Sequence, residues 1–348
     1  MTQLIFLDQN HWITLARAYN GKEDNPDLVK LANKVISKSE SEEAIFPLII
    51  NHFIETTRRV DPESRLKLAK FMVKVSNGHT MLPYCIVTPH EVEEAICKEM
   101  GWPQIDLHKF VLRKGFDYLI GGEASIEGKG EMNGDTEILI TEEIIEKTSD
   151  WLPDSFRKQL FDYIGKKISL NVLIRHYFDS PDNFLLFCER FYESDKERFN
   201  DKELVKTIEA LRKEKRDECP DKDYRYRVEL ARAIYGRLVP LMTEVYKKYQ
   251  VPIEILKARP IPKDLDEFIK NVPTFYVDFQ LTYLRDIDYN TPVDVNDLMD
   301  ITALAVAIPY CDIVVFERKF GSFVRQKKLD KLYGTVIITN LLELNDYL

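Results

Sequence analysis

Carboxylates near both ends of the chain are placed where they could bind a divalent cation. Asp8 ends the apolar run at 3–7, and Glu317 ends the run at 313–316 in the same way. Open parallel sheets bind ligands at the carboxyl ends of their strands, so both acids are candidate ligands. Hard cations such as Mg²⁺ and Mn²⁺ take carboxylate oxygens and water. For Asp8 an alternative is open, because Asp at the start of a helix also caps backbone N–H groups.

Glu55 is a further candidate ligand in the N-terminal part of the chain. It lies in the stretch 49–59, which is expected to be helical and begins with apolar residues. Arg58 and Arg59 follow three and four residues later, so an ion pair on the helix surface is an open alternative to a metal contact. Both arginines are also candidate contacts for substrate phosphates.

Two aspartates share a face of an expected helix near the C-terminus. Asp297 and Asp300 are three residues apart in the stretch 296–308, so they project from the same side of that helix. The helix dipole favours acids in the first turn, which explains Asp297 more easily than Asp300. Asp312 precedes the run that Glu317 ends and is a substitute for it as a metal ligand. These acids supply the carboxylates that metal-dependent phosphodiester hydrolysis needs.

Basic residues crowd the segment after Glu317. They are candidate contacts for phosphate groups, Arg318 and Lys319 first among them. A solvated charged face is an equally open interpretation. The formal net charge of −9 argues against a protein that coats nucleic acid by bulk attraction, but a local basic patch can still bind phosphates. The segment contains Arg318, Lys319, Arg325, Lys327, Lys328 and Lys331.

Short strands and helices at both ends of the chain must position these side chains. A strand–helix–strand order suits a parallel sheet with a right-handed crossover, which predicts an α/β catalytic domain built from both chain ends, 1–94 and 290–348. Between them, 95–289 is charged and helix-rich and predicts a mainly α-helical insertion domain. The expected strands are 3–8, 44–48, 312–316 and 335–339, and the expected helices are 27–38, 49–59, 61–75, 204–217, 225–249 and 296–308.

The composition indicates a soluble, globular protein. Of the 348 residues, 45% are hydrophobic and 31% are charged, enough to form a core and a solvated surface. The N-terminal apolar run lacks a basic region and is interrupted by Asp8, so neither a signal peptide nor a membrane span is expected. A cytoplasmic location without membrane partners follows as an expectation. The glycine-rich stretch 121–134 predicts a loop excursion and contains no phosphate-binding motif.

The order of these motifs resembles the PIN-domain nucleases. The resemblance rests on Leu-Asp8-x-Asn10, on Glu55 within a helix, on Asp300-Ile-Thr-Ala-Leu-Ala-Val-Ala, and on Ile-Val-Val-Phe-Glu317-Arg-Lys-Phe. Position by position, Asp8 matches the first acid, Asn10 the polar residue two positions later, Glu55 the second acid and Asp300 the third. The resemblance covers roughly 1–90 and 290–348 and says little about the middle of the chain.

The resemblance implies a Rossmann-like α/β/α fold and RNA cleavage with Mg²⁺ or Mn²⁺ held by acidic side chains. One departure is Glu317, because the family usually places Asp there in a Thr-x-Asp pattern, so Asp312 or Asp297 are open alternatives for the fourth ligand. The resemblance therefore implies a metal-dependent endoribonuclease, toxin-like or in defence. The alternative is a catalytically inactive PIN-like scaffold that binds RNA or protein.

The expected partners are an RNA substrate and, as open alternatives, an inhibitory protein or a second copy of the chain. A Rossmann-type dinucleotide-binding protein is disfavoured because no GxGxxG motif follows the first strand.

Overall fold

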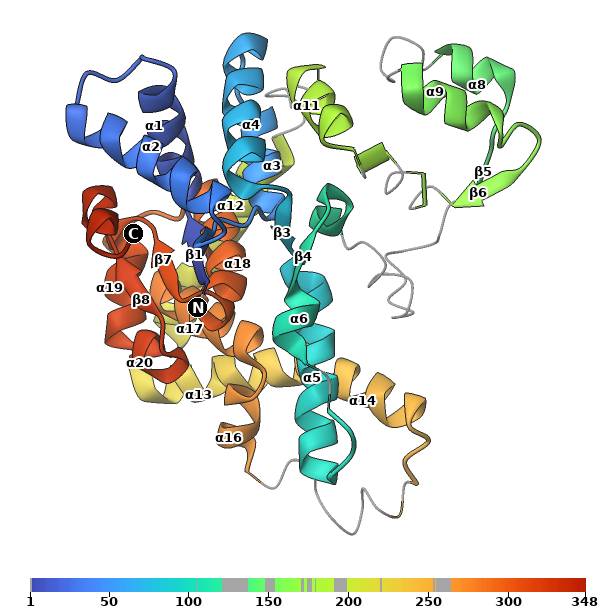
Figure 1. Ribbon diagram of the computed structural model, residues 1–348. Coiled ribbons are helices and arrows are strands. Elements are labelled where there is room, and N and C mark those ends of the chain that lie inside the picture. Colours follow the sequence, from blue (N-terminus) through green and yellow to red (C-terminus); the bar gives the residue numbers. More distant parts are fainter. Residues whose placement is uncertain are drawn as a thin grey trace. The chain divides into compact units, whose positions relative to one another are not determined.

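The chain folds into two compact units, seen in the computed structural model in Figure 1. The first unit consists of Met1–Pro83, Leu112–Ser194 and Asn340–Leu348, and the second of Tyr84–Val111 and Asp195–Thr339. The predicted catalytic and insertion domains divide the chain at other points, and that division stays a prediction. The described residues are 2–104, 106–120, 137–147, 154–169, 172–173, 177–178, 180–190, 199–219, 221–252, 254 and 264–348.

The first unit begins with a strand–helix–helix–strand order. Strands β1 and β2 pair in parallel, with Gln3 opposite Ala44 and Leu4 opposite Ile45. The expected strand at 44–48 is therefore shorter than predicted. The elements of this unit are β1 (Gln3–Leu7), α1 (Gln9–Tyr19), α2 (Pro26–Glu40), β2 (Ala44–Ile45), α3 (Ile50–Thr57), α4 (Pro62–Ser76), β3 (His79–Met81), β4 (Leu112–Lys114), η1 (Phe116–Ile120), β5 (Glu137–Leu139), α8 (Glu142–Lys147), α9 (Asp154–Phe161), β6 (Lys167–Ser169), α11 (Pro181–Arg190) and η3 (Leu341–Asp346).

Local sequence signals explain where helix α4 begins and ends. The Asp61 carboxylate accepts a hydrogen bond from the Ser64 backbone N–H, 2.9 Å away, and Pro62 occupies the first turn, where no N–H is needed. Asn77 ends the helix in the left-handed conformation, with φ 48°. The buried face of α4 includes Phe71, which meets the Trp12 ring of α1 edge-on at 6.1 Å. Helices α1, α2 and α4 therefore form one packed group, in blue in Figure 1.

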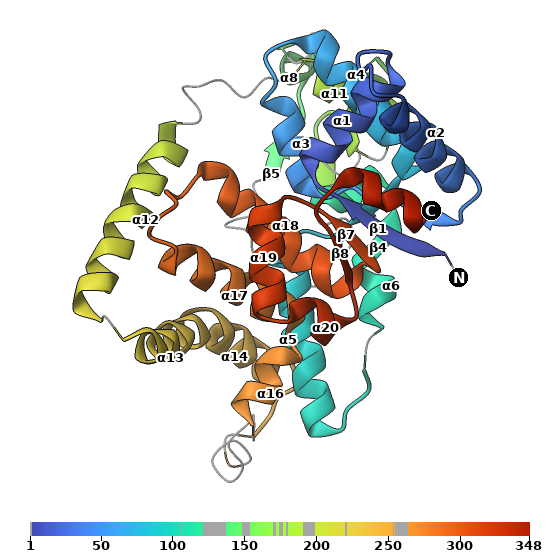
Figure 2. The same ribbon diagram turned by 90° about the vertical axis from the view of Figure 1, so that its left-hand side faces the viewer.

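The second unit contains most of the long helices. Its core combines α5, α14, α16 and α17, with Phe268 and Phe275 fully buried. Figure 2 shows α17, α18 and α19 side by side. The elements are α5 (Tyr84–Met100), α6 (Leu107–Val111), α12 (Phe199–Glu218), α13 (Lys222–Ala233), η2 (Ile234–Leu238), α14 (Val239–Lys248), α16 (Leu265–Lys270), α17 (Pro273–Ile287), α18 (Val295–Tyr310), β7 (Ile313–Val315), α19 (Arg318–Gln326), α20 (Leu329–Tyr333) and β8 (Val336–Ile338).

The C-terminal strands also pair in parallel. Strand β7 is buried throughout and pairs with β8, with Val314 opposite Ile337. Helix α18 precedes β7 and continues through Pro309 to Tyr310. The expected helix 296–308 therefore ends two residues later than predicted, because a proline in the last turn keeps a helical φ and lacks only its own N–H. Parallel strands at both chain ends and helices around them confirm a mixed α/β protein.

The middle of the chain is mainly helical, but it also contains short strands. β3 pairs with β4 and β5 with β6, both antiparallel. The stretch 225–249 is not one regular helix, because a π-helical turn, Ile234–Leu238, separates α13 from α14. The glycine-rich stretch 121–134 lies outside the described residues. Among the helices of the described chain, none combines the length and the apolar character needed to cross a membrane.

Candidate active site

Asp8 lies where the first strand passes into the first helix. It is the N-cap residue of α1, with φ −63° and ψ 156°. Its backbone carbonyl accepts hydrogen bonds from the N–H groups of His11 (2.9 Å) and Trp12 (3.1 Å), but its carboxylate does not cap the helix. The capping alternative is therefore not realised. The half-buried Asp8 carboxylate lies at the carboxyl end of a parallel strand, and exposed Asn10 follows it in the first turn.

Helix α3, which carries Glu55, is held against this strand–helix junction. The His52 ring stacks on Phe6 of β1, with ring centroids 5.2 Å apart. Gln9 of α1 donates a hydrogen bond from Nε2 to Thr56 Oγ1 over 3.0 Å, inside the core. Glu55 lies between the two contact residues along α3 and is half-buried. These contacts join the two segments that carry the predicted acids of this unit.

The His52 side chain is buried and packs against β1. Its Nδ1 accepts a hydrogen bond from the Ile49 backbone N–H over 3.2 Å, which leaves the proton of the neutral ring on Nε2. Burial lowers the pKa of His52 to about 3. The ring therefore stays neutral near pH 7 and supports α3 without serving as a cation at the site.

Arg59 is turned towards the start of α4. Its Nε and Nη2 both donate to Ser64 Oγ, at 3.3 and 3.0 Å. The alternative predicted for Glu55, an ion pair with Arg58 or Arg59, stays open beside the metal contact. Arg58 is half-buried and follows α3 as its C-cap residue. The phosphate contacts predicted at both arginines stay predictions.

The Asp297 carboxylate makes structural contacts at the start of α18 and with α19. Its Oδ2 accepts a hydrogen bond from the Asp294 backbone N–H over 3.0 Å, which completes the start of α18. Its Oδ1 pairs with Lys319 Nζ of α19 over 2.5 Å, and the side chain is only 6% exposed. A metal at Asp297 would have to share a buried carboxylate whose charge Lys319 already neutralises. The first-turn interpretation therefore explains Asp297 better than metal ligation does.

The ion pair between Lys319 and Asp297 also connects the two helices that carry the predicted acids of the second unit. Asp300 lies one turn into α18 beyond Asp297 and is half-buried. Glu317 is the N-cap residue of α19, two positions before Lys319. The bridge from Lys319 to Asp297 ties together the starts of the helices that carry Asp300 and Glu317.

Glu317 repeats the backbone geometry of Asp8. It follows β7 with φ −66° and ψ 154°, and its side chain does not cap α19. The corresponding angles of Asp8 are −63° and 156°. Each acid thus stands at the carboxyl end of a parallel strand, as the N-cap residue of the following helix, without acting as a cap. The sequence resemblance between the two motifs extends to their conformation.

Asp312 lies at the opposite end of β7 from Glu317. It precedes the strand, is exposed, and its carbonyl accepts a hydrogen bond from Val336 N–H over 2.8 Å. At about 3.3 Å per residue, the strand separates the Cα atoms of Asp312 and Glu317 by roughly 16 Å. The two carboxylates therefore cannot bind the same ion. Asp312 lies at the amino end of β7, and ligands of parallel sheets bind at the carboxyl ends of strands, so Asp312 is disfavoured as a substitute for Glu317.

The basic residues after Glu317 do not form one free surface. Lys319 pairs with Asp297, as described above. Lys327 Nζ lies 4.7 Å from the centroid of the Tyr226 ring, and burial lowers its pKa. Arg318 is exposed at the first position of α19. Of these three cations, Arg318 is the one best placed to meet a phosphate, while Lys319 and Lys327 have structural contacts.

Lys319→Ala is expected to destabilise the fold. The substitution leaves the Asp297 carboxylate buried without its cation, at a cost of about 2–3 kcal/mol in the free energy of unfolding. Urea denaturation measures the loss, and the matched variant Arg318→Ala, exposed and one residue away, should change stability by less than about 0.5 kcal/mol. Asp297→Asn added to Lys319→Ala should recover part of the loss. If Lys319→Ala and Arg318→Ala are equally stable, the ion pair between Lys319 and Asp297 does not stabilise the fold.

The four predicted acids divide between the two units. Asp8 and Glu55 belong to the first unit, and Asp300 and Glu317 to the second. Within the described part of the chain, no group of three or more His, Cys, Asp or Glu side chains is gathered as a metal site. The shared metal site stays a prediction.

Comparisons with known proteins give no relative for this chain. No family model, no curated protein and no solved structure matches it. The resemblance to the PIN-domain nucleases therefore rests on the motifs of this sequence alone.

Proposed function

We propose that this protein is a metal-dependent endoribonuclease with a PIN-like catalytic domain, in which Asp8, Glu55, Asp300 and Glu317 bind Mg²⁺ or Mn²⁺. The observation that carries the proposal is the pair of acids at the carboxyl ends of β1 and β7. Both occupy N-cap positions, yet neither carboxylate caps its helix. The PIN-like sheet that would join both chain ends is part of the proposal.

Other N-cap residues of this protein show what capping acids look like. Asp61 accepts from the Ser64 N–H over 2.9 Å, and Asp221 accepts from the Tyr224 N–H over 2.8 Å. Capping stabilises a helix by roughly 1 kcal/mol, so an acid at an N-cap position normally makes this bond. The departure at Asp8 and Glu317 supports a role outside the helix for both carboxylates.

The residues present fit a hard divalent cation. Carboxylate oxygens are the ligands that Mg²⁺ and Mn²⁺ prefer, and neutral His52 adds no competing positive charge beside α3. The bound metal would supply an activated water and stabilise the charge that develops on the phosphate. In this proposal the four acids hold the ion and orient it, and Asn10 and Arg318 contact the RNA backbone.

The biological setting is proposed by analogy alone. A toxin-like or defence role, in the cytoplasm, would call for an inhibitory partner protein to keep the activity silent, and a homo-oligomer is a further candidate assembly. An inactive PIN-like scaffold remains the second candidate, because Glu317 replaces the Asp usual in the family. The same RNA assay separates the two.

Cleavage of RNA by the purified chain should depend on metal. Single-stranded and hairpin RNAs labelled at one end are incubated with Mn²⁺, with Mg²⁺, or with EDTA. Cleavage is expected with either metal, none with EDTA, and recovery when excess Mn²⁺ follows EDTA. Cleavage that persists in EDTA would contradict the mechanism. A folded protein that leaves every RNA intact in Mn²⁺ would contradict the enzyme and favour the scaffold.

A further inference from the structure

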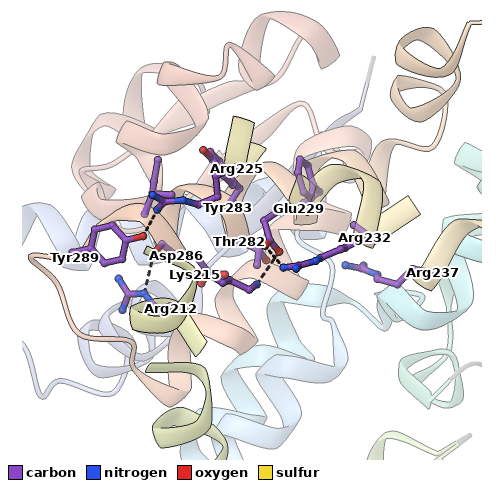
Figure 3. Close-up of a pocket in the computed structure, with 13 residues that line it drawn as sticks. Arg212, Lys215, Arg225, Glu229, Arg232, Arg237, Thr282, Tyr283, Asp286 and Tyr289 are labelled. Atoms are coloured by element: carbon purple, nitrogen blue, oxygen red, sulfur yellow. Dashed lines mark hydrogen bonds and ion pairs between the residues drawn. The ribbon is translucent and has the colours of Figure 1, made fainter. Parts of the chain in front are cut away.

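The second unit contains a basic pocket of about 460 Å³ that lies outside the predicted acids (Figure 3). Its walls come from α12, α13, the π-helical turn, α17 and the residue Tyr289. A volume in this range suits a small ligand with one or two rings. Five of its lining residues are cationic, namely Arg212, Lys215, Arg225, Arg232 and Arg237.

Two buried arginines make the inner wall rigid. Arg212 donates hydrogen bonds to the backbone carbonyls of Arg285 (3.1 Å), Asp286 (3.1 Å) and Asp288 (2.5 Å) at the end of α17. Arg225 donates to the Cys219 carbonyl over 2.8 Å. Arg225 also donates to the Tyr289 hydroxyl (Figure 3). The Arg212 guanidinium also pairs with Glu209 over 2.6 Å, so Arg225 supplies the fixed positive charge of this wall.

The acids of the pocket are already engaged by cations. Glu229 accepts from Lys215 Nζ at 2.8 Å and from Arg232 Nη1 at 2.9 Å, so one carboxylate serves two cations. Asp286 pairs with Arg285 over 2.7 Å. The bonds from Arg225 to the Cys219 carbonyl and the Tyr289 hydroxyl go to neutral oxygens. The pocket therefore carries an excess of positive charge, which attracts an anion.

Cations with remaining donor capacity stand at the pocket surface. The Arg232 side chain is 59% exposed, and Lys215 is 29% exposed. Each has further N–H groups beyond the one bonded to Glu229. Arg237 is placed by the π-helical turn and held by Asp278 Oδ2 over 2.7 Å. Arginine forks and a lysine ammonium together match the oxygens of a phosphate group.

Aromatic rings stand beside these cations. The guanidinium groups of Arg212, Arg216 and Arg225 surround the Tyr289 ring, and Arg216 Cζ lies 4.8 Å from its centroid. The Tyr283 and Phe279 side chains also line the pocket. Proteins often bind a nucleotide with an aromatic ring that stacks on the base and with cationic side chains that bind the phosphate.

We infer that this pocket binds a nucleotide through its phosphate and its base, either as a free nucleoside monophosphate or as the 5′-phosphorylated end of an RNA. Charge selects the phosphate, because Lys215 and Arg232 lie side by side on Glu229 and Arg237 lines the same pocket. The half-buried Tyr289 is the ring placed to contact a base, while the almost fully buried Phe279 and Tyr283 form part of the apolar wall. The site is separate from the acids proposed for catalysis, and binding requires no metal.

Binding is measured in EDTA, so that it does not depend on cleavage. Isothermal titration uses AMP, UMP, the matching nucleosides and inorganic phosphate. Fluorescence anisotropy uses single-stranded RNAs with either a 5′-phosphate or a 5′-hydroxyl. Lys215→Ala and Arg232→Ala should each weaken nucleotide binding about tenfold. Arg227→Ala, on the exposed side of the same helix α13, is the matched control and should bind as the wild type does.

Glu229→Gln should bind the nucleotide more tightly, because the substitution removes the negative charge that Lys215 and Arg232 now share.

The two sources of the ligand give different results. Tight binding of AMP or UMP identifies a free nucleotide, and binding restricted to 5′-phosphorylated RNA identifies an RNA end. In both cases, nucleosides and phosphate alone should bind more weakly. The inference is overturned if neither nucleotides nor 5′-phosphorylated RNA bind at millimolar concentration. It is also overturned if Lys215→Ala and Arg232→Ala, confirmed as folded by thermal unfolding, bind as the control does.

Discussion

Asp8→Asn and Asp300→Asn are each expected to slow Mn²⁺-dependent RNA cleavage about a thousandfold, equivalent to roughly 4 kcal/mol of transition-state stabilisation. Asn keeps the size of the side chain and removes the negative charge that holds the cation. The helices should remain intact, because the Asp8 carboxylate does not cap α1 and Asp300 lies beyond the capped first turn of α18. Single-turnover cleavage of labelled RNA measures the rate, and circular dichroism checks the fold.

Two control variants test whether the effect belongs to the site. Asp61→Asn replaces an acid that does cap its helix, and Asn caps equally well, so activity and stability should both be retained. Asp312→Asn removes the acid at the far end of β7 and should leave cleavage unchanged, whereas Glu317→Gln should reduce it strongly. Full activity in Asp8→Asn, or a loss in Asp312→Asn as large as that in Glu317→Gln, would contradict the assignment of these acids.

The buried Glu91 is expected to make stability depend on pH. Glu91 is fully buried on α5, where its Oε2 accepts from the Thr274 N–H (2.9 Å) and its Oε1 from the Tyr310 hydroxyl (2.7 Å). Burial raises the pKa of Glu91 from 4.5 to about 8. Between these values the folded protein retains a proton that the unfolded chain releases. The stabilisation is therefore complete below pH 4.5 and is lost as pH rises towards 8.

Glu91→Gln should remove this dependence, because an amide is neutral at every pH. The difference in unfolding free energy between wild type and Glu91→Gln should fall by on the order of 4 kcal/mol from pH 5 to pH 8.5. Urea denaturation at pH 5, 7 and 8.5 gives this difference. Glu93→Gln, on the same helix but paired with Lys248 at 2.8 Å, should keep the wild-type slope. Parallel pH profiles for wild type and Glu91→Gln would show that Glu91 does not hold the proton.

The strand ends that carry the candidate site were predictable from the sequence. Short apolar runs followed by an acid predicted β1 with Asp8 and β7 with Glu317, because burial and the following polar residue are local properties. The cap at Asp61 and the left-handed stop at Asn77 were predictable for the same reason. Each of these features depends on residues a few positions apart.

Features that depend on distant partners could not be predicted. The sequence placed Asp297 and Asp300 on one helix face and favoured a first-turn role for Asp297, but it could not show that Lys319, 22 residues away, pairs with Asp297. The π-helical turn inside 225–249 arises where Val239 N–H bonds to the Ile234 carbonyl, just before Pro240. Periodicity does not reveal such a shift in hydrogen bonding.

The basic pocket was missed for a related reason. Its cations come from α12, α13 and the π-helical turn, and its rings come from α17 and Tyr289. In the sequence, each charge appears as part of a solvated helix face. The arginines at 225, 232 and 237 were a usable signal, but the bond of Arg232 to Glu229 and that of Arg225 to Tyr289 are properties of the folded unit.

Titration of Mn²⁺ into wild type, Asp8→Asn and Asp300→Asn by calorimetry measures whether these two carboxylates hold the metal. Asp8 and Asp300 lie in different units of the chain, so a single metal site that needs both residues would require ligands from each. Mn²⁺ should bind to wild type at one class of site, and each variant should lose a large part of this affinity. Undiminished Mn²⁺ affinity in either folded variant, or no Mn²⁺ binding to wild type in the millimolar range, would contradict the proposal that these two carboxylates hold the metal.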